Sequence, residues 1–356
     1  MSASATSGGL PIAITMGDPA GIGPEIVVKA FRDAPELTRG CFVVGDLATL
    51  RRAAASLSEP GAASMPMALI EDPREVAQLP PNCVPVLQAI AAPQGVVVGR
   101  VGAAAGRAAG DSVVWAARAA LTRQVAAIVT APLHKESLSA AGFTFPGHTE
   151  LLQAEAAAHL GLPVAQLPVR MMLANDELRT VLVSIHMALR LAIDAVDVDG
   201  VLQTIRIAHR ALLAALGRAP RIGVAGLNPH AGEGGLFGRE ELDIISPAIA
   251  AARAEGIDAN GPYAPDTVFM RARSAAGIAG EFDVVIAMYH DQGLIPVKYL
   301  GVDKGVNVTL GLPLVRTSPD HGTAFDIAGT GRADAASLIE AIKMARSLAP
   351  TALRAA

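Results

Sequence analysis

The sequence has few cysteines, few aromatic residues, no strongly charged block and no uninterrupted apolar run of membrane-spanning length. Cys41 and Cys83 are its only cysteines among 356 residues, and neither has a partner at a metal-binding spacing. Two unpatterned cysteines predict a reduced, cytoplasmic protein. The first residues, MSASATSGG, lack the basic and apolar segments of a signal peptide and predict a flexible tail over 1–9.

Other shortages narrow the range of partners. The net charge is only −4, and the absence of a Lys/Arg-rich or aromatic-interleaved basic patch argues against nucleic acid. The closest candidate for a membrane span, TVLVSIHMALRLAIDAV, is interrupted by His186, Arg190 and Asp194, so no membrane partner is expected. The glycine-rich stretch 17–26 fits neither G-x-G-x-x-G nor G-x-x-x-x-G-K-[ST], which excludes both nucleotide-binding fingerprints there.

The chain instead alternates two patterns, and its length suits about two domains. Short, mostly continuous apolar runs are typical of strands covered on both faces, and they lie at 12–15, 41–44, 126–129, 169–173, 180–185, 221–226 and 283–288. Longer Ala/Leu-rich stretches with charged faces predict helices at 103–124, 149–160, 198–216, 239–255 and 333–348. The least patterned segment, 56–82, predicts loops with one short element. Alternating strands and helices indicate an α/β fold with parallel or mixed sheets.

Several of the apolar runs end in unusual polar loops. These loops read GDPAGIGPE, TAPLHKES, HMALR, LNPHAGEGG and YHDQG. In open α/β sheets, ligands bind in the crevice outside the strand ends. The loops therefore predict one shared site.

The eight histidines divide into two groups by their surroundings. His159 and His209 lie inside helical patterns and are expected at the surface or its boundary. The other six sit in loops or at strand ends: His134, His148, His186, His230, His290 and His321. Among these, His186, His230 and His290 each end or closely follow an apolar run. Three imidazoles with one open position form a catalytic type of metal site. Their separations are long, with no HxxxH or HExxH spacing, so three separate loop histidines bonded to the backbone remain an equal alternative.

Two kinds of segment suggest anion binding. Lys298, Asn307 and Arg316 follow YHDQG, and together a point cation, an amide donor and a bidentate fork suit a phosphate or carboxylate. The alternative is solvated surface charge. The stretch 305–331 is unusually long for a plain loop, which favours a function. The stretch 17–26 permits either a well-capped strand-to-helix turn or a close backbone approach to a ligand.

Taken in order, these motifs resemble the 4-hydroxythreonine-4-phosphate dehydrogenase family of vitamin B6 biosynthesis. The likeness runs from ITMGDPAGIGPEI through TAPLHKESL, FPGHTELL, GLNPHAGEGG and MYHDQGLIPVK to GVNVTLGLPLVRTSPDHGTAFDIAGTG, nearly the whole chain. HGTAFDIAG and GDPAGIGPE also resemble the isocitrate and isopropylmalate dehydrogenase superfamily. This resemblance implies a two-domain α/β/α sandwich with mixed, largely parallel sheets. We expect a cofactor-side domain of 10–136 plus 296–356, and a metal and dimerisation domain of 137–295.

The resemblance also implies a metal centre. Its ligands would be His186, His230 and His290, around one divalent ion per site, Zn, Mg, Mn or Co. Family members are homodimers whose active site lies at the subunit interface, with one metal histidine from the neighbouring subunit. By position, the candidates for proton transfer and catalysis are Lys298, Asp291 and Asp266.

Substrate and cofactor positions follow from the same likeness. The substrate-binding residues would be His148, Thr149, Lys298, Asn307 and Arg316. The cofactor, NAD or NADP, would contact Gly17, Asp18, Gly21, His321, Gly322, Thr323 and Asp326. The implied substrate is a small anionic metabolite whose charged end these groups orient.

The implied reaction oxidises a secondary alcohol β to a carboxylate and then releases CO₂. The metal would act as a Lewis acid on the substrate hydroxyl, and hydride would pass to the cofactor. The expected conversion is 4-phosphohydroxy-L-threonine to 3-amino-2-oxopropyl phosphate. The same motifs occur in relatives acting on D-threonate or D-erythronate 4-phosphate and in terephthalate cis-dihydrodiol dehydrogenases. Two alternatives of another class are a phosphate acyltransferase of related fold, which would need no catalytic metal, and a non-catalytic binder of anionic metabolites. The three histidines argue against the acyltransferase.

Overall fold

The computed structural model describes residues 9–58, 63–275, 277–301 and 304–349. The predicted tail, 1–9, therefore lies outside the described residues except for Gly9. The chain forms two compact units: unit 1 is 1–168 with 312–356, and unit 2 is 169–311. The chain passes between the units at 168–169 and 311–312, whereas the expected boundaries were 136–137 and 295–296.

Packing explains why these boundaries differ. Helix α6 (His148–Leu160) contributes Leu151 and Leu152 to the unit 1 core, so the chain stays in unit 1 beyond residue 136. Helix α11 (His290–Tyr299) contributes Leu294 and Val297 to the unit 2 core. Side-chain burial on one face of each helix thus fixes the unit to which it belongs.

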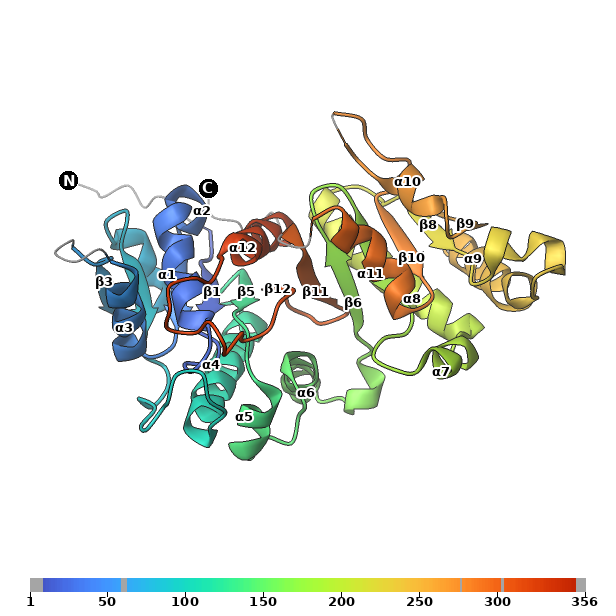
Figure 1. The fold of residues 1–356 in the computed structure, drawn as a ribbon. Helices are drawn as coiled ribbons and strands as arrows, with labels where there is room; N and C mark the ends of the chain where they lie inside the picture. Colours follow the sequence, from blue (N-terminus) through green and yellow to red (C-terminus); the bar gives the residue numbers. More distant parts are fainter. Residues whose placement is uncertain (1–8, 59–62, 276, 302–303, 350–356) are drawn as a thin grey trace. The chain divides into compact units, whose positions relative to one another are not determined.

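Unit 1 is built on parallel strands (Figure 1). They are β1 (Ile12–Thr15), β2 (Cys41–Val44), β3 (Met67–Ile70), β4 (Val84–Leu87), β5 (Ala127–Thr130) and β12 (Arg316–Pro319). Their order is β3-β4-β2-β1-β5-β12, and the registers recorded for these neighbours are all parallel. The residues of β1, β2 and β5 are buried throughout, as their continuous apolar runs predict.

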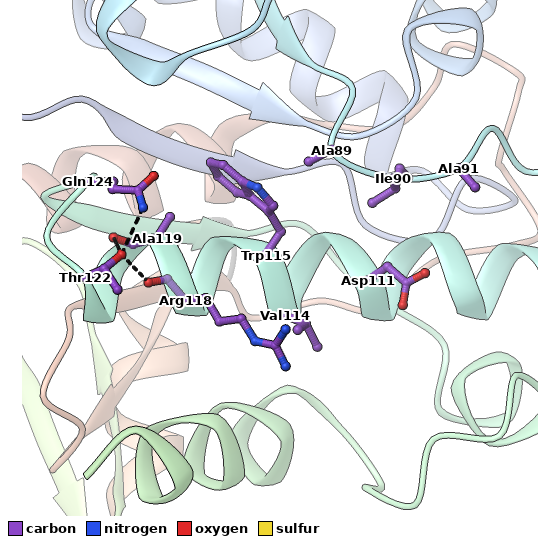
Figure 2. Close-up of a pocket in the computed structure, with 10 residues that line it drawn as sticks. All are labelled: Ala89, Ile90, Ala91, Asp111, Val114, Trp115, Arg118, Ala119, Thr122 and Gln124. Atoms are coloured by element: carbon purple, nitrogen blue, oxygen red, sulfur yellow. Dashed lines mark hydrogen bonds between the residues drawn. The ribbon is translucent and has the colours of Figure 1, made fainter.

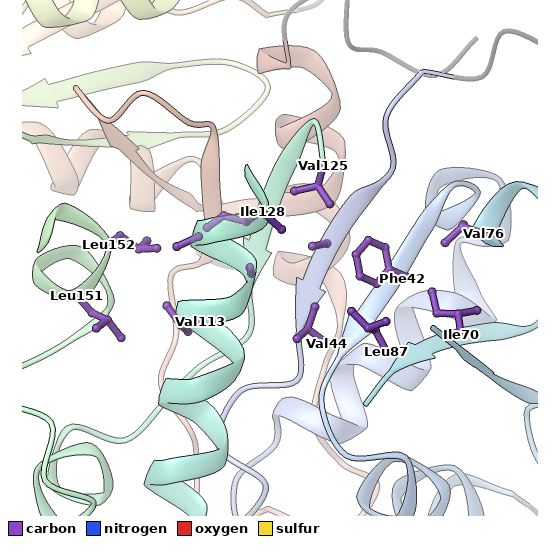
Figure 3. Packing of buried hydrophobic residues seen from close by; sticks show 14 residues of the cluster. Phe42, Val44, Ile70, Val76, Leu87, Val113, Val125, Ile128, Leu151 and Leu152 are labelled. Carbon is purple, nitrogen blue, oxygen red and sulfur yellow. The ribbon is translucent and has the colours of Figure 1, made fainter. Parts of the chain in front are cut away.

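The helices of unit 1 cover this sheet. They are α1 (Gly23–Asp33), α2 (Pro35–Thr38), α3 (Leu47–Leu57), α4 (Ala103–Leu121), α5 (Lys135–Ala140), α6 and α12 (Ala336–Leu348), with 3₁₀ turns η1 (Pro73–Gln78) and η2 (Val164–Gln166). Figure 3 shows Val113 of α4, Ile128 of β5, and Phe42 and Val44 of β2 as members of one buried cluster. Each such buried side chain stabilises the fold by about 1.5–3 kcal/mol.

Unit 2 has a mixed set of strands. They are β6 (Arg170–Ala174), β7 (Arg179–Leu182), β8 (Ile222–Ala225), β9 (Ala259–Tyr263), β10 (Val284–Ala287) and β11 (Val306–Leu310). Their order is β11-β6-β7-β10-β8-β9, with antiparallel pairing at β11-β6 and β6-β7 and parallel pairing from β7 to β9. Around them lie α7 (Leu189–Asp194), α8 (Val198–Leu216), η3 (Pro229–Gly235), η4 (Glu241–Ile245), α9 (Ser246–Ala254), α10 (Val268–Ala272) and α11.

The parallel part of unit 2 positions the candidate site. Strands β7, β10 and β8 are neighbours and run in the same direction, so their carboxyl ends share one edge. His186 follows β7, His290 follows β10, and His230 follows β8. The predicted α/β class with mixed, largely parallel strands is confirmed. Among the described residues, no helix combines the length and apolar character needed to cross a bilayer.

Candidate active site

His186 and His290 are brought together at the shared strand edge of unit 2. The centroids of their imidazole rings lie 5.6 Å apart, with the ring planes tilted by 45°. His290 Nδ1 lies 2.7 Å from Asp291 Oδ1, which leaves Nε2 as the nitrogen that faces away from this carboxylate. A carboxylate on the far nitrogen is the usual outer partner of a metal-binding histidine, because it fixes the tautomer and the ring orientation.

His230 sits on a different kind of support. It lies in η3, where His230, Ala231 and Glu233 have φ values of 53°, 53° and 46° between glycines that are also left-handed. Left-handed backbone costs a non-glycine residue about 1–2 kcal/mol, so this turn is strained. The His230 ring has the same carboxylate pairing, since its Nδ1 lies 3.1 Å from Glu233 Oε2. Strain of this kind concentrates at functional sites.

The three predicted metal histidines do not form one cluster within a single chain. The described residues contain no group of three or more His, Cys, Asp or Glu side chains that could hold a metal ion. The structure therefore joins His186 with His290, and His230 stands on its own loop beside Phe237, 5.9 Å between ring centroids. His230 and His290 each contact a carboxylate, and His186 lies beside His290. Imidazoles of this kind are suitable donors for Zn²⁺ or a similar ion.

The remaining predicted residues of unit 2 lie on three elements. Asp291 is exposed beside His290 at the start of α11. Lys298 is partly buried in the last turn of the same helix. Asn307 is partly buried on β11, in register with Leu173 of β6. Asp266 is exposed in the turn after β9, away from the strand ends that carry the histidines in the sequence. Asp291 thus has a structural reason to act with His290, and Asp266 has none in these contacts.

Unit 1 contains a compact polar site around Arg316. The Arg316 side chain is buried at the start of β12, and its Nε and a terminal guanidinium nitrogen donate to Thr130 Oγ1 at 3.0 and 2.8 Å. Burial lowers the pKa of Arg316 to about 10, and the charge of Glu150 acts in the opposite direction. His148 and Thr149 begin α6, whose N-cap, Gly147, supplies no side-chain hydrogen bond.

His148 stands close to this guanidinium. Burial, reinforced by the positive charge of Arg316, holds the pKa of His148 well below its usual range, so the imidazole is neutral at physiological pH. Its Nε2 is buried and has no hydrogen-bond partner among the described residues. A guanidinium, an uncapped helix N-terminus and an unpaired imidazole nitrogen together offer what a phosphate or carboxylate end with adjacent polar groups requires.

The predicted cofactor residues divide into an exposed and a buried set. His321, Gly322 and Asp326 are exposed in the loop 320–335, which connects β12 with α12, whereas Thr323 is buried. A Cβ on Gly322 would meet no described heavy atom within 4 Å, so a ligand has room there. An exposed carboxylate such as Asp326 suits the ribose hydroxyls of a dinucleotide.

The buried set lies in the stretch 17–26. A Cβ on Gly21 would lie 2.9 Å from Thr323 Cβ, and one on Gly17 would lie 2.5 Å from Pro132 O. Asp18 is fully buried and accepts from Ala20 N at 2.8 Å, and burial raises its pKa. These contacts assign the stretch a packing role beneath the loop 320–335. Direct contact of Gly17, Asp18 and Gly21 with a cofactor stays a prediction.

A cleft in unit 1 lies away from these residues. Figure 2 shows it between the loop after β4 and helix α4, with a volume of about 510 Å³. It is lined by Ala89, Ile90, Ala91, Asp111, Val114, Trp115, Arg118, Ala119, Thr122 and Gln124. None of the predicted site residues lines it. Its guanidinium, Arg118, pairs with Glu155 at 2.7 Å.

Sequence patterns missed the residues that hold these loops. Ser184, Glu241 and Gln292 bond to the backbone at the ends of the strands that carry the histidines. One signal was present: Gln292 is the third residue of a helix that starts at His290, where a Gln side chain commonly reaches back to the helix start. Lys135 was also missed, and its Cε lies 3.8 Å from a Cβ built on Gly147, next to His148.

Comparisons with known proteins agree over almost the whole chain. The model of a family described as "Pyridoxal phosphate biosynthetic protein PdxA" matches residues 38–345. The 4-hydroxythreonine-4-phosphate dehydrogenase of Beijerinckia indica is 52% identical over 338 residues, 95% of this chain and 95% of that protein. The D-threonate 4-phosphate dehydrogenase of Salmonella typhimurium is 46% identical over 339 residues, 95% of this chain and 98% of that protein. The crystal structure of 4-hydroxythreonine-4-phosphate dehydrogenase from Klebsiella pneumoniae matches with a TM-score of 0.83 and 42% identity, covering 96% of this chain and 99% of that one.

Proposed function

Since the chain belongs to the family of the pyridoxal phosphate biosynthetic protein PdxA, we propose that it oxidises 4-phosphohydroxy-L-threonine and releases 3-amino-2-oxopropyl phosphate and CO₂. The predicted family is thereby confirmed, and the chain is an oxidoreductase that acts on a CH–OH group. The observation that carries the substrate assignment is the 52% identity to a 4-hydroxythreonine-4-phosphate dehydrogenase across 95% of both chains.

The metal proposal rests on the histidines of unit 2. His186, His230 and His290 would hold one divalent ion, and the two carboxylate-backed rings support this. A bound ion of this kind supplies Lewis-acid stabilisation of negative charge on the substrate oxygen. The task of the chain's own residues is to fix the orientation of each imidazole, and the contacts of Asp291 with His290 Nδ1 and of Glu233 with His230 Nδ1 support this role.

The dimer proposal rests on apolar surface next to each histidine. The exposed side chains are Met187, Leu189, Leu191 and Ile193 after His186, Leu236 and Phe237 after His230, and Ile295 and Tyr299 after His290. Large exposed apolar side chains that form a continuous patch mark protein interfaces. A second copy of the chain would cover them, and His230 would complete the His186–His290 pair of that partner. This accounts for the absence of a three-histidine cluster among the described residues of one chain.

The phosphate end of the substrate would be bound by a positively charged side chain and by the N-terminus of a helix. In unit 1, Arg316 offers a guanidinium fixed by Thr130, and Thr149 lies at the positive end of α6. His148 is neutral, so its Nε2 would serve a hydroxyl, an amine or a protonated phosphate oxygen. Lys298 and Asn307, which lie in unit 2, stay predicted substrate-binding residues. Holding a substrate rigidly makes the chemical steps effectively unimolecular.

The cofactor proposal rests on the loop 320–335. NAD or NADP would lie along its exposed residues His321, Gly322 and Asp326, and would accept the hydride removed from the substrate's carbon. Glu25 fixes this loop from below, because its carboxylate accepts from the backbone N–H groups of Gly329 and, at 3.1 Å, of Gly331. A loop held in this way can present the same surface to each cofactor molecule.

A second substrate is favoured by one observation. The 46% identity to a D-threonate 4-phosphate dehydrogenase is only a little below the 52% to the first enzyme. The two substrates differ at the carbon next to the carboxylate, which carries an amine in one and a hydroxyl in the other. The oxidation and loss of CO₂ are the same in both, so the site chemistry serves either.

The test is a substrate comparison with the purified protein. 4-Phosphohydroxy-L-threonine, D-threonate 4-phosphate and the terephthalate cis-dihydrodiol would each be supplied with NAD⁺ or NADP⁺, with and without a chelator. We expect reduced cofactor from the first substrate, and loss of that activity on chelation. A higher kcat/KM for D-threonate 4-phosphate would reassign the substrate, and turnover that survives complete removal of metal would rule out the metal role.

A further inference from the structure

We propose that Gln292 is a positioning residue that fixes the loop of His230 against the turn of His290, through hydrogen bonds to the backbone of both. This inference rests on the proposed metal site. Gln292 belongs to YHDQG, the motif whose histidine and aspartate already have proposed roles. Its side chain bonds to backbone groups, Met288 N and Gly226 O.

One amide group joins the ends of two strands. Gln292 lies in the first turn of α11 and is buried. Its Oε1 accepts from Met288 N at 2.7 Å, just beyond β10 and two residues before His290. Its Nε2 donates to Gly226 O at 2.8 Å, just beyond β8 and four residues before His230. The labels β8, β10 and α11 in Figure 1 mark the elements that this side chain connects.

The Gly226–Leu227 peptide is held from both sides. Its carbonyl accepts from Gln292, and its N–H, on Leu227, donates to Glu241 Oε1 at 2.7 Å. The same Glu241 oxygen accepts from Asn228 N at 2.7 Å. Beyond Asn228 the chain enters the left-handed turn of η3, which lies outside the hydrogen-bonded strand β8. The direction in which His230 is presented is therefore set by the anchored peptide that precedes the turn.

Met288 connects this arrangement to the third histidine. Its N–H donates to Gln292, and its carbonyl accepts from Ser184 Oγ at 2.9 Å. Ser184 lies two residues before His186, so the backbone around His186 is tied to the same point. The three strand ends that carry the predicted ligands thus share one hydrogen-bonded framework, with Gln292 as its bridge between β10 and β8.

The chemistry of this bridge calls for an amide. Gln offers one acceptor and one donor on the same planar group, which matches an N–H on one side and a carbonyl on the other. A glutamate at this position would keep the acceptor for Met288 but would turn a second acceptor toward the Gly226 carbonyl. A leucine would satisfy neither group and would leave two buried backbone groups unpaired.

The test measures Co²⁺ binding by the full chain, without turnover. Gln292→Leu and Gln292→Glu would be compared with the wild type by chelator competition and by the visible absorption of bound Co²⁺. Gln88→Leu is the matched control, because Gln88 makes the same kind of bridge in unit 1, accepting from Leu47 N at 2.8 Å and donating to Ile90 O at 3.1 Å. Ser184→Ala is a milder variant, which removes only the side-chain bond to Met288 O.

We expect Gln292→Leu to weaken Co²⁺ binding by about 10–100-fold, as is usual when an outer support of a metal ligand is lost. Gln292→Glu should weaken it nearly as much, whereas Gln88→Leu should lower stability without changing Co²⁺ affinity. If Gln292→Leu does not fold, Gln292→Glu and Ser184→Ala still decide the question.

Two results are kept separate by this design. Wild-type Co²⁺ affinity and absorption in folded Gln292→Leu or Gln292→Glu would overturn the positioning role. If the wild type itself bound Co²⁺ no better than His230→Ala and His290→Ala, the proposed metal site would fail instead.

Discussion

Two glycine-rich loops follow strands of this protein, and they do opposite things. The stretch 17–23 after β1 is buried, and its glycines allow neighbouring backbone to approach closely. A Cβ on Gly23 would lie 2.4 Å from Met16 O. The stretch 229–235 after β8 is mostly exposed, and at Gly234 a Cβ would meet no described heavy atom within 4 Å. Its glycines serve a left-handed backbone that displays His230. Glycines after a strand therefore indicate either close packing of the backbone or a left-handed backbone conformation. The surrounding structure decides between the two.

Among substitutions that test this difference between the two loops, His230→Gly should have the largest effect on activity. Removing the imidazole should lower kcat by about 10³-fold, because metal-assisted charge stabilisation contributes several kcal/mol. The same change should raise the free energy of unfolding by about 1 kcal/mol, because glycine accepts the φ of 53° without strain. Steady-state kinetics and urea unfolding measure the two. His230→Ala is the control, with equal loss of activity and no gain in stability. A less stable His230→Gly would show that the turn is not strained.

The next effect belongs to the buried loop. Gly23→Ala should lower the free energy of unfolding by about 3 kcal/mol, because the added Cβ would overlap a backbone oxygen that cannot easily move. Gly102→Ala is the control, since a Cβ there meets no described heavy atom within 4 Å and only the weaker N-cap preference is lost, about 1 kcal/mol. Equal losses for the two variants, measured by urea unfolding, would contradict the packing role.

The two regions also differ in their histidines, since the ring nitrogen Nε2 of His148 is buried and His230 is exposed. Because the folded protein keeps His148 neutral, its unfolded form binds the extra proton below the ordinary pKa of 6.5. Stability should therefore be constant with respect to this group above pH 6.5 and should fall below it, by up to about 1.4 kcal/mol per pH unit.

The variant His148→Gln should reduce this dependence on pH, and the exposed His159→Gln should leave it unchanged. Unfolding by urea at several pH values between 4.5 and 7.5 (about two units below the ordinary pKa and one above) makes the measurement. An unaltered slope in His148→Gln would mean that other groups cause the acid sensitivity.

The smallest effect distinguishes strain from crowding. Gly234→Ala should lower the free energy of unfolding by about 1 kcal/mol. The residue has a φ of 67°, which strains alanine, but the added Cβ would lie in open space. Its thermal midpoint should thus fall less than that of Gly23→Ala. A larger fall would contradict the open surroundings of Gly234.

The sequence predicted the regular parts of the fold because burial on both faces leaves a plain signal. The strands at 12–15 and 41–44 and the helix at 198–216 match the structure residue for residue. The stretch 305–331 was expected to be a loop, yet it contains β11 and β12, whose short runs are separated by glycine and proline. The segment 56–82 contains both β3 and η1, where one short element was expected. Of these strands β3 is partly exposed, whereas β11 and β12 are mostly buried but carry polar residues that interrupt the apolar run, such as Arg316, Thr317 and Ser318.

Helix α11 shows why local patterns fail near the site. Gly293 and Pro296 both disfavour a helix, but tertiary packing overrides them. A Cβ on Gly293 would lie 2.4 Å from Leu182 Cδ2, so the glycine lets the helix rest directly on β7. The pair His186 and His290 could be proposed from the sequence because each follows a strand. Gln292 could not, because its partners are backbone groups of strands far apart in the chain.

The division of unit 1 between 1–168 and 312–356 has a consequence for biosynthesis. Arg316 reaches Thr130 only after β12 has been added beside β5, and that strand is among the last parts of the chain to leave the ribosome. A nascent chain that stops within unit 2 lacks the guanidinium of the anion site as well as the loop 320–335. Unit 2, an unbroken stretch, can fold first. If Arg316 binds the phosphate end of the substrate as proposed, this binding is acquired late in translation, and shortened products should not compete for the metabolite.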